Sequence, residues 1–108
     1  MGNNTYKSIP KSYKPLKNRF NLVLTKEKLT SNHKNLLYFN NIYDILLYIH
    51  EHKELFNDVY IIGGNQIYNI FLDLYIIQNI YITYICEIDY NCDTFFNFNE
   101  YKKYYKFS

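Results

Sequence analysis

The spacing of apolar residues divides the chain into short segments typical of strands and helices. Residues 20–24 alternate and predict a strand. Residues 59–62 form a short apolar run, which is typical of a buried strand. Residues 80–85 predict a further strand, with Tyr81, Thr83 and Ile85 on one face. Residues 10–18, with two prolines, and the polar residues 25–35 are expected to be loops.

Three helices are also predicted, two of them between these strands and one before the first. The main one carries apolar residues at helical spacing, with Asn40 or Asn41 before it and Asp44 in its first turn: Ile42, Ile45, Leu46 and Ile49. Residues 65–72 predict a second helix that packs through Ile67, Phe71 and the Tyr68 ring. A short helix over residues 5–9, capped by Asn3, Asn4 or Thr5, is expected to end at Pro10. Strands that alternate with helices favour an α/β domain with parallel strands and right-handed crossovers.

Composition narrows the class of protein. A chain of 108 residues forms one domain at most, and its net charge of +2 is too small to indicate nucleic-acid binding. Cys86 and Cys92 suit neither a disulfide framework nor a zinc site, so a reducing, cytoplasmic compartment is expected. Glycine and polar residues interrupt the longest apolar region, residues 59–85, so no membrane span is expected there.

Gly63 and Gly64 are two of the three glycines in the chain, and they stand between a predicted strand and a predicted helix. Glycine reaches backbone angles that other residues avoid, and it lets a ligand approach the main chain closely. The start of a helix also favours phosphate. The pair alone is equally typical of a tight turn that binds nothing, and the G-x-G-x-x-G and P-loop patterns are absent.

Five segments in order resemble dihydrofolate reductase. They are MGNNTYKSIP, KPLKNRFNLVLTK, VYIIGGNQIY, IYITYI and CDTFF, the last containing Asp93 to Phe96. The resemblance implies a central mixed, mostly parallel sheet flanked by helices, and a cis peptide within the glycine pair. It also implies the reduction of 7,8-dihydrofolate to tetrahydrofolate with NADPH as cofactor.

The resemblance implies three groups of cofactor-binding residues. The first would form the wall for the nicotinamide and the pyrophosphate: Ile62, Gly63, Gly64, Asn65, Gln66, Ile67 and Tyr68. The second would bring another helix start to the pyrophosphate: Gly2, Asn3, Asn4 and Thr5. The third would hold the adenosine ribose and its 2′-phosphate: Leu24, Thr25 and Lys26. Without the resemblance, Lys26 would be interpreted as an ordinary surface lysine.

For the substrate, the resemblance implies that Arg19 binds the glutamate carboxylate of dihydrofolate. Arg19 is the only arginine in the chain, and its planar guanidinium can donate two parallel hydrogen bonds to a carboxylate. Six further residues are implied around the pterin and the benzoyl ring: Ser8, Ile9, Leu16, Ile62, Tyr68 and Thr83. Thr83 matches a threonine that hydrogen-bonds a substrate-orienting carboxylate. No catalytic residue is assigned.

The sequence also departs from the family pattern. Asn3 stands where the family carries Arg or Lys, and Met1 is the Met of the M-G motif. The family's N-terminal strand, loop and acid-bearing helix, and its last strand, have no counterpart in these 108 residues. We therefore expect an incomplete domain over residues 1–108 that is inactive alone.

Two alternatives remain open at this stage. One is a non-catalytic relic or complementation module that pairs with a separate chain, such as the missing N-terminal segment. The other is a reductase of similar fold that acts on another pterin-like or pyrimidine substrate. Fusion to thymidylate synthase is also left open by the sequence.

Overall fold

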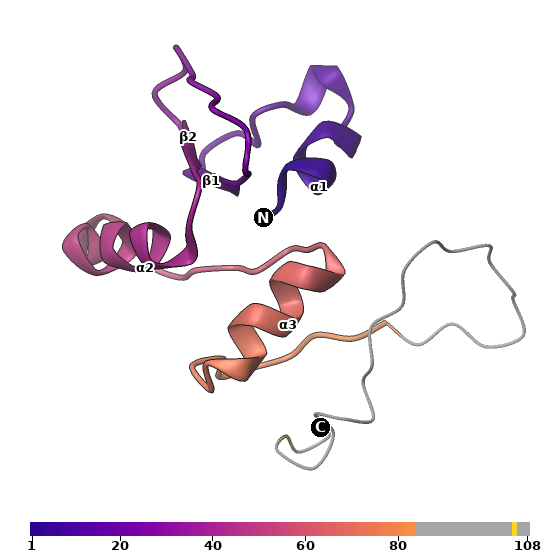
Figure 1. The fold of residues 1–108 in the computed structure, drawn as a ribbon, viewed down its shortest axis with the longest axis vertical. Coiled ribbons are helices and arrows are strands. Elements are labelled where there is room, and N and C mark those ends of the chain that lie inside the picture. Colours follow the sequence, from indigo (N-terminus) through magenta and orange to yellow (C-terminus); the bar gives the residue numbers. More distant parts are fainter. Residues whose placement is uncertain (84–104, 106–108) are drawn as a thin grey trace, which may run out of the picture.

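The computed structural model describes residues 1–83 and residue 105. The end of the predicted 80–85 strand, both cysteines and Asp93 to Phe96 lie outside the described residues. The elements are α1 (Asn3–Ser8), η1 (Lys11–Tyr13), β1 (Asn21–Leu24), β2 (Leu36–Phe39), α2 (Ile42–Glu51), η2 (Lys53–Leu55) and α3 (Asn65–Asp73) (Figure 1).

Strands β1 and β2 pair in parallel, with Asn21 opposite Leu36 and Leu24 opposite Phe39. The predicted α/β class with parallel strands is confirmed, and β1 lies where the alternation places it. Sequence reasoning missed β2, which ends at Phe39, two positions before the Asn41 cap of α2. A strand this short shows no periodicity of its own, and its pairing with β1 is what defines it.

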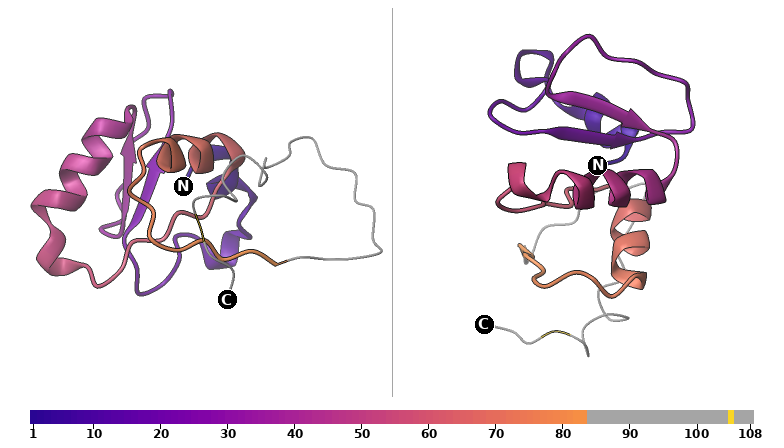
Figure 2. Two further views of the ribbon diagram at one scale, coloured as in Figure 1. Left: turned by 90° about the horizontal axis from the view of Figure 1, so that it is seen from below. Right: turned by 90° about the vertical axis from the view of Figure 1, so that its left-hand side faces the viewer.

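Helices cover both faces of this small sheet (Figure 2). On one face, Val23 packs with Tyr6 of α1 and with Leu36, which together form the α1 core. On the other face, Leu22 and Leu24 pack against the α2–α3 core, whose buried members are Ile45, Ile67 and Phe71. Alternate residues of β1 therefore serve the two cores, as the period of a strand requires.

Met1 and Gly2 occupy a third strand position beside β1. The amino group of Met1 donates to Leu22 O at 2.9 Å, and Leu24 N–H donates to Met1 O at 2.9 Å. Gly2 forms a parallel bridge with Leu24. On its other side, Gly2 N–H donates to Gly63 O at 2.7 Å. The N-terminus thus lies at the centre of the molecule, between α1, β1 and the start of α3 (Figures 1 and 2).

The predicted start of α2 is confirmed. Asn41 is the N-cap, and its side-chain oxygen accepts a hydrogen bond from Asp44 N–H at 3.1 Å. The predicted side-chain cap of α1 is wrong, because the N-cap is Gly2 and no side chain bonds to it there. The bridge from Gly2 to Leu24 fixes where this helix begins, so Asn3, Asn4 and Thr5 fall inside its first turn.

The predicted buried strand at residues 59–62 is also wrong. Val59, Tyr60 and Ile62 are 50%, 69% and 38% exposed, and no described residue pairs with them in a ladder. A strand needs hydrogen-bonded backbone partners. Among the described residues, the backbone hydrogen bond nearest to this segment is the one from Gly2 N–H to Gly63 O, which lies just beyond its end. Residues 80–83 likewise form no strand in the described part of the chain.

None of the helices within residues 1–83 is both long enough and apolar enough to cross a membrane.

The replacement of Ile45 by Ala tests the α2–α3 core. Ile45 is 4% exposed, so Ile45→Ala should lower the free energy of unfolding by about 2–5 kcal/mol through lost burial and a cavity. Leu47→Ala on the same helix is the matched control. Leu47 is 54% exposed, and its truncation should change stability by no more than about 0.5 kcal/mol. Urea unfolding measures both, and equal losses would contradict this placement of α2.

In a polypeptide that begins at Met1, the amino group of Met1 makes stability depend on pH. Burial lowers the pKa of this group from its ordinary value of 8.0. As pH falls through 8.0, the unfolded chain takes up the proton first, so the free energy of unfolding should decrease until the folded chain is protonated as well. Denaturation between pH 9 and pH 6 measures this slope. Acetylation of Met1 removes the charge and should abolish the slope, and a slope that survives acetylation would contradict the assignment.

Candidate functional site

The glycine pair forms a sharp turn directly before α3. Gly63 has φ of +115°, a backbone conformation that residues with a side chain rarely adopt. Gly64 follows in an extended conformation as the N-cap of α3. The peptide bond between them is cis, as the resemblance implies. The sequence therefore places glycine where the backbone requires it.

The starts of α1 and α3 meet at this turn. A Cβ atom at Gly2 would lie 3.3 Å from Ile67 Cγ1. A Cβ atom at Gly63 would lie 3.4 Å from Tyr68 Oη and 3.5 Å from Thr5 Oγ1. We call this group of Gly2, Thr5, Gly63, Gly64, Ile67 and Tyr68 the glycine junction. It brings together residues that lie about sixty positions apart in the sequence.

Backbone donors at the start of α3 lack intrahelical acceptors. The first helical hydrogen bond runs from Tyr68 N–H to Gly64 O at 3.0 Å, and no side chain within the described part of the chain caps the helix. The N–H groups of Asn65, Gln66 and Ile67 therefore have no acceptor within the helix. Asn65 Oδ1 is buried and has no hydrogen-bond partner among the described residues. An anion with a neighbouring N–H or O–H donor would satisfy both features.

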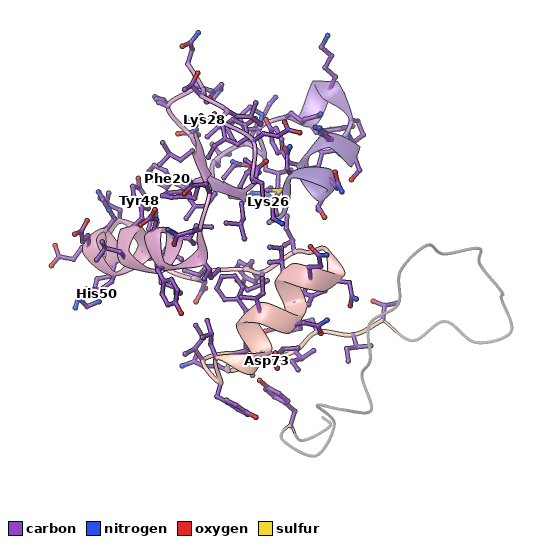
Figure 3. The ribbon with its side chains drawn as sticks, in the orientation of Figure 1. Phe20, Lys26, Lys28, Tyr48, His50 and Asp73 are labelled. Atoms are coloured by element: carbon purple, nitrogen blue, oxygen red, sulfur yellow. The ribbon has the colours of Figure 1, made fainter. Side chains whose placement is uncertain are left out.

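The turn after β1 presents lysines near α1. Thr25 is buried, and its hydroxyl oxygen accepts a hydrogen bond from Glu27 N–H at 3.2 Å, which leaves its O–H able to donate. Lys26 is exposed and has no acidic partner among the described residues. In Figure 3, Lys26 lies toward α1, and Lys28 lies farther out on the connection that follows β1.

The described residues line two open cavities that share residues 57–62. The first, of about 720 Å³, is lined by Leu16, Arg19, Leu24, Ile62 and Ile67, among others. The second, of about 860 Å³, is lined by Ile62, Tyr68 and Thr83, among others. Among the described residues, Asp58 is the one carboxylate that lines either cavity. Sequence reasoning missed Asp58, which no motif marks.

The structure does not gather all the predicted substrate residues into one wall. Leu16 and Arg19 line the first cavity, and Tyr68 and Thr83 line the second. Ser8 and Ile9 line neither cavity. The Ser8 hydroxyl donates to Thr5 O at 2.6 Å, and Ile9 packs against the α1 core. The predicted cofactor residues, in contrast, cluster at the glycine junction and along the end of β1.

Comparison with known families decides the assignment. The family model described as dihydrofolate reductase matches residues 1–108. The chain belongs to the dihydrofolate reductase family. This dihydrofolate reductase homologue is 40% identical to dihydrofolate reductase of Schistosoma mansoni over 101 residues, covering 89% of this chain and 52% of that protein. It is 33% identical to the enzyme of Gallus gallus over 105 residues, covering 94% and 54%.

A third relative is named as a bifunctional enzyme. The bifunctional dihydrofolate reductase-thymidylate synthase of Plasmodium chabaudi is 36% identical over 100 residues, covering 89% of this chain and 17% of that protein. The chain thus spans about half the length of the single-function relatives described above.

Substitution of Gly63 tests the backbone of the glycine junction. Gly63→Ala should lower the free energy of unfolding by about 1–3 kcal/mol, because φ of +115° is strained for any side chain. Gly64→Ala is the matched control: its φ is −82°, and its Cβ would meet Thr5 Oγ1 at 3.4 Å, an ordinary contact. Urea unfolding midpoints of the two variants should differ clearly. A Gly64→Ala loss as large as that of Gly63→Ala would contradict this geometry.

Proposed function

We propose that this chain serves the NADPH-dependent reduction of 7,8-dihydrofolate to tetrahydrofolate, and that the glycine junction holds the cofactor. The observation that carries the proposal is the meeting of α1 and α3 at Gly2, Gly63 and Gly64. Added Cβ atoms at these three positions would lie 3.3–3.4 Å from their nearest neighbours, which are side-chain atoms of Ile67, Tyr68 and Thr5, so the two helix starts pack this closely because all three positions are glycine. Glycine also lets a ligand approach the main chain closely.

The residues present fit the phosphates of a dinucleotide. The N–H groups of Asn65, Gln66 and Ile67 supply donors where the helix dipole favours negative charge. The buried Asn65 Oδ1 can accept a hydrogen bond from a ligand donor. Bound NADPH supplies the hydride for the reduction. The chain's own part is to orient the cofactor and to exclude water from it.

Lys26 and Thr25 are proposed to discriminate NADPH from NADH. Lys26 is exposed at the end of β1 and free of an acidic partner among the described residues, so it can approach a 2′-phosphate as a point charge. The Thr25 hydroxyl is held by the hydrogen bond from Glu27 N–H in the same turn. Leu24, at the end of β1, supplies apolar surface to the first cavity. The contribution of this group to affinity is therefore mainly electrostatic.

Arg19 is proposed to bind the glutamate carboxylate of dihydrofolate. It lines the first cavity with Leu16 and Ile62, which supply apolar surface for the ring that precedes that carboxylate. The roles of Ser8, Ile9, Tyr68 and Thr83 in binding the pterin and the benzoyl ring remain part of this proposal. A cytoplasmic location and a linkage to thymidylate synthase, as in the Plasmodium chabaudi relative, are proposals of the same kind.

Calorimetric titration with NADPH tests the proposal directly, because the residues named above bind rather than transfer protons. The 108-residue chain should bind NADPH, and NADH should bind more weakly. Failure to bind either nucleotide would contradict the assignment of the glycine junction.

Lys26→Gln should weaken NADPH binding and leave NADH binding unchanged. An exposed ion pair is worth about 0.2–1 kcal/mol, so the affinity for NADPH should fall by a factor of about 1.4 to 5. Lys28→Gln is the matched control, since Lys28 is also exposed and lies two residues farther along the same turn. Titrations at low salt measure both variants. An equal effect of the two substitutions would mean that Lys26 acts through general surface charge.

A further inference from the structure

Asn21 is a polar side chain at a position that strand periodicity assigns to the core. It is 2% exposed, on the same face of β1 as Val23. Burial of an amide is unfavourable unless its hydrogen bonds are satisfied. The partners of Asn21 therefore show what the buried amide does.

The Asn21 amide closes the loop of residues 16–20 onto the start of β1. Its Oδ1 accepts from Leu16 N–H at 2.9 Å, and its Nδ2 donates to Leu16 O at 3.0 Å. Nδ2 also donates to Arg19 O at 3.0 Å. Both amide hydrogens and the oxygen are thus used, which is the satisfied state of a buried asparagine. No apolar residue of similar size could replace these three bonds.

The backbone of Asn21 is held in place by the sheet. Asn21 N–H donates to Asn35 O at 2.7 Å, and Asn21 pairs with Leu36 in the sheet. Within the loop, Asn18 adopts φ of +60°, which reverses the chain before Arg19. The three side-chain hydrogen bonds therefore hold the backbone of Leu16 and Arg19 in a fixed place relative to the sheet.

The Arg19 side chain is arranged by the same loop. Its Nε donates to Lys17 O at 3.1 Å, which fixes the inner edge of the guanidinium. Among the described residues this is its one hydrogen bond, so its two terminal nitrogens keep donors for a ligand. The loop thus holds both the backbone and the side chain of the residue that lines the first cavity.

We propose that Asn21 is a positioning residue for the carboxylate site of Arg19. It holds the 16–20 loop so that the guanidinium meets the carboxylate of the substrate's glutamate tail in one fixed geometry. The proposal rests on the proposed function, because it assumes that Arg19 binds that carboxylate. Asn21 itself touches no ligand and acts through the loop.

The test compares two ligands that differ in the glutamate tail. Dihydrofolate carries the tail, and 6-methyl-7,8-dihydropterin lacks it. Arg19→Gln and Asn21→Ala should each weaken dihydrofolate binding by about tenfold, since a charge-assisted bidentate contact is lost or misplaced. Both should leave binding of the tail-less pterin within about twofold. Calorimetric titration of each variant measures the four affinities.

Val23→Ala is the matched control for loss of stability. Val23 is fully buried on the same face of β1, two residues from Asn21, and its side chain packs in the α1 core and has no group that could hydrogen-bond the 16–20 loop. It should destabilise the fold without changing the ratio of the two affinities. If Asn21→Ala weakens both ligands equally, as a loss of core would, the inference is overturned while the proposed function stands.

Two further outcomes are distinguishable. If Arg19→Gln leaves the ratio unchanged, or the chain binds neither ligand, the proposed role of Arg19 fails and the inference fails with it. Hydrogen exchange on the unsubstituted chain tests the hydrogen-bond network even if Asn21→Ala does not fold. Leu16 N–H should exchange as slowly as the amides of β1, and exchange at the rate of an open loop would overturn the inference.

Discussion

The hydrogen bond from Gly2 N–H to Gly63 O, at 2.7 Å, is the contact on which the rest of the structure depends. On one side Gly2 continues into α1, and on the other the chain turns at Gly63 into α3. Because Gly2 also bridges to Leu24, this one residue ties both helix starts to the sheet. The α1 core and the α2–α3 core are therefore held in register at the place where the cofactor is proposed to bind.

Residues 57–62 pair with no strand among the described residues. They line both cavities, so open space borders them on two sides, and three of their apolar side chains are exposed. Unpaired extended backbone with apolar side chains readily pairs with other chains. The segment is fixed at its end, through Gly63, and at the aromatic contact of Phe56 with Phe20, whose ring centroids lie 5.2 Å apart. Tyr48 of α2 joins this aromatic group, with its ring centroid 6.3 Å from that of Phe56, and both Phe20 and Phe56 line the first cavity.

Sequence patterns correctly predicted the elements that depend on interactions between residues close together in the chain. The period of α2, its Asn41 cap, the alternation of β1 and the helix after the glycine pair are confirmed. Features that depend on distant partners were missed or wrong. β2 exists through its pairing with β1, and no strand in the described part of the chain pairs with residues 59–62. The role of Asn21 was equally hidden, although a polar residue at a core position of β1 is the signal that could have found it.

Nuclear magnetic resonance of the ¹⁵N-labelled chain during NADPH titration tests the central claim most directly. The account predicts that the amide signals of Gly2 to Thr5 and of Gly63 to Ile67 shift together, because both helix starts would face one ligand. The amides of Tyr43 and Leu47, on the exposed face of α2, should stay in place. Shifts confined to one helix start, or shifts spread over α2 instead, would contradict the claim that the glycine junction is a single cofactor site.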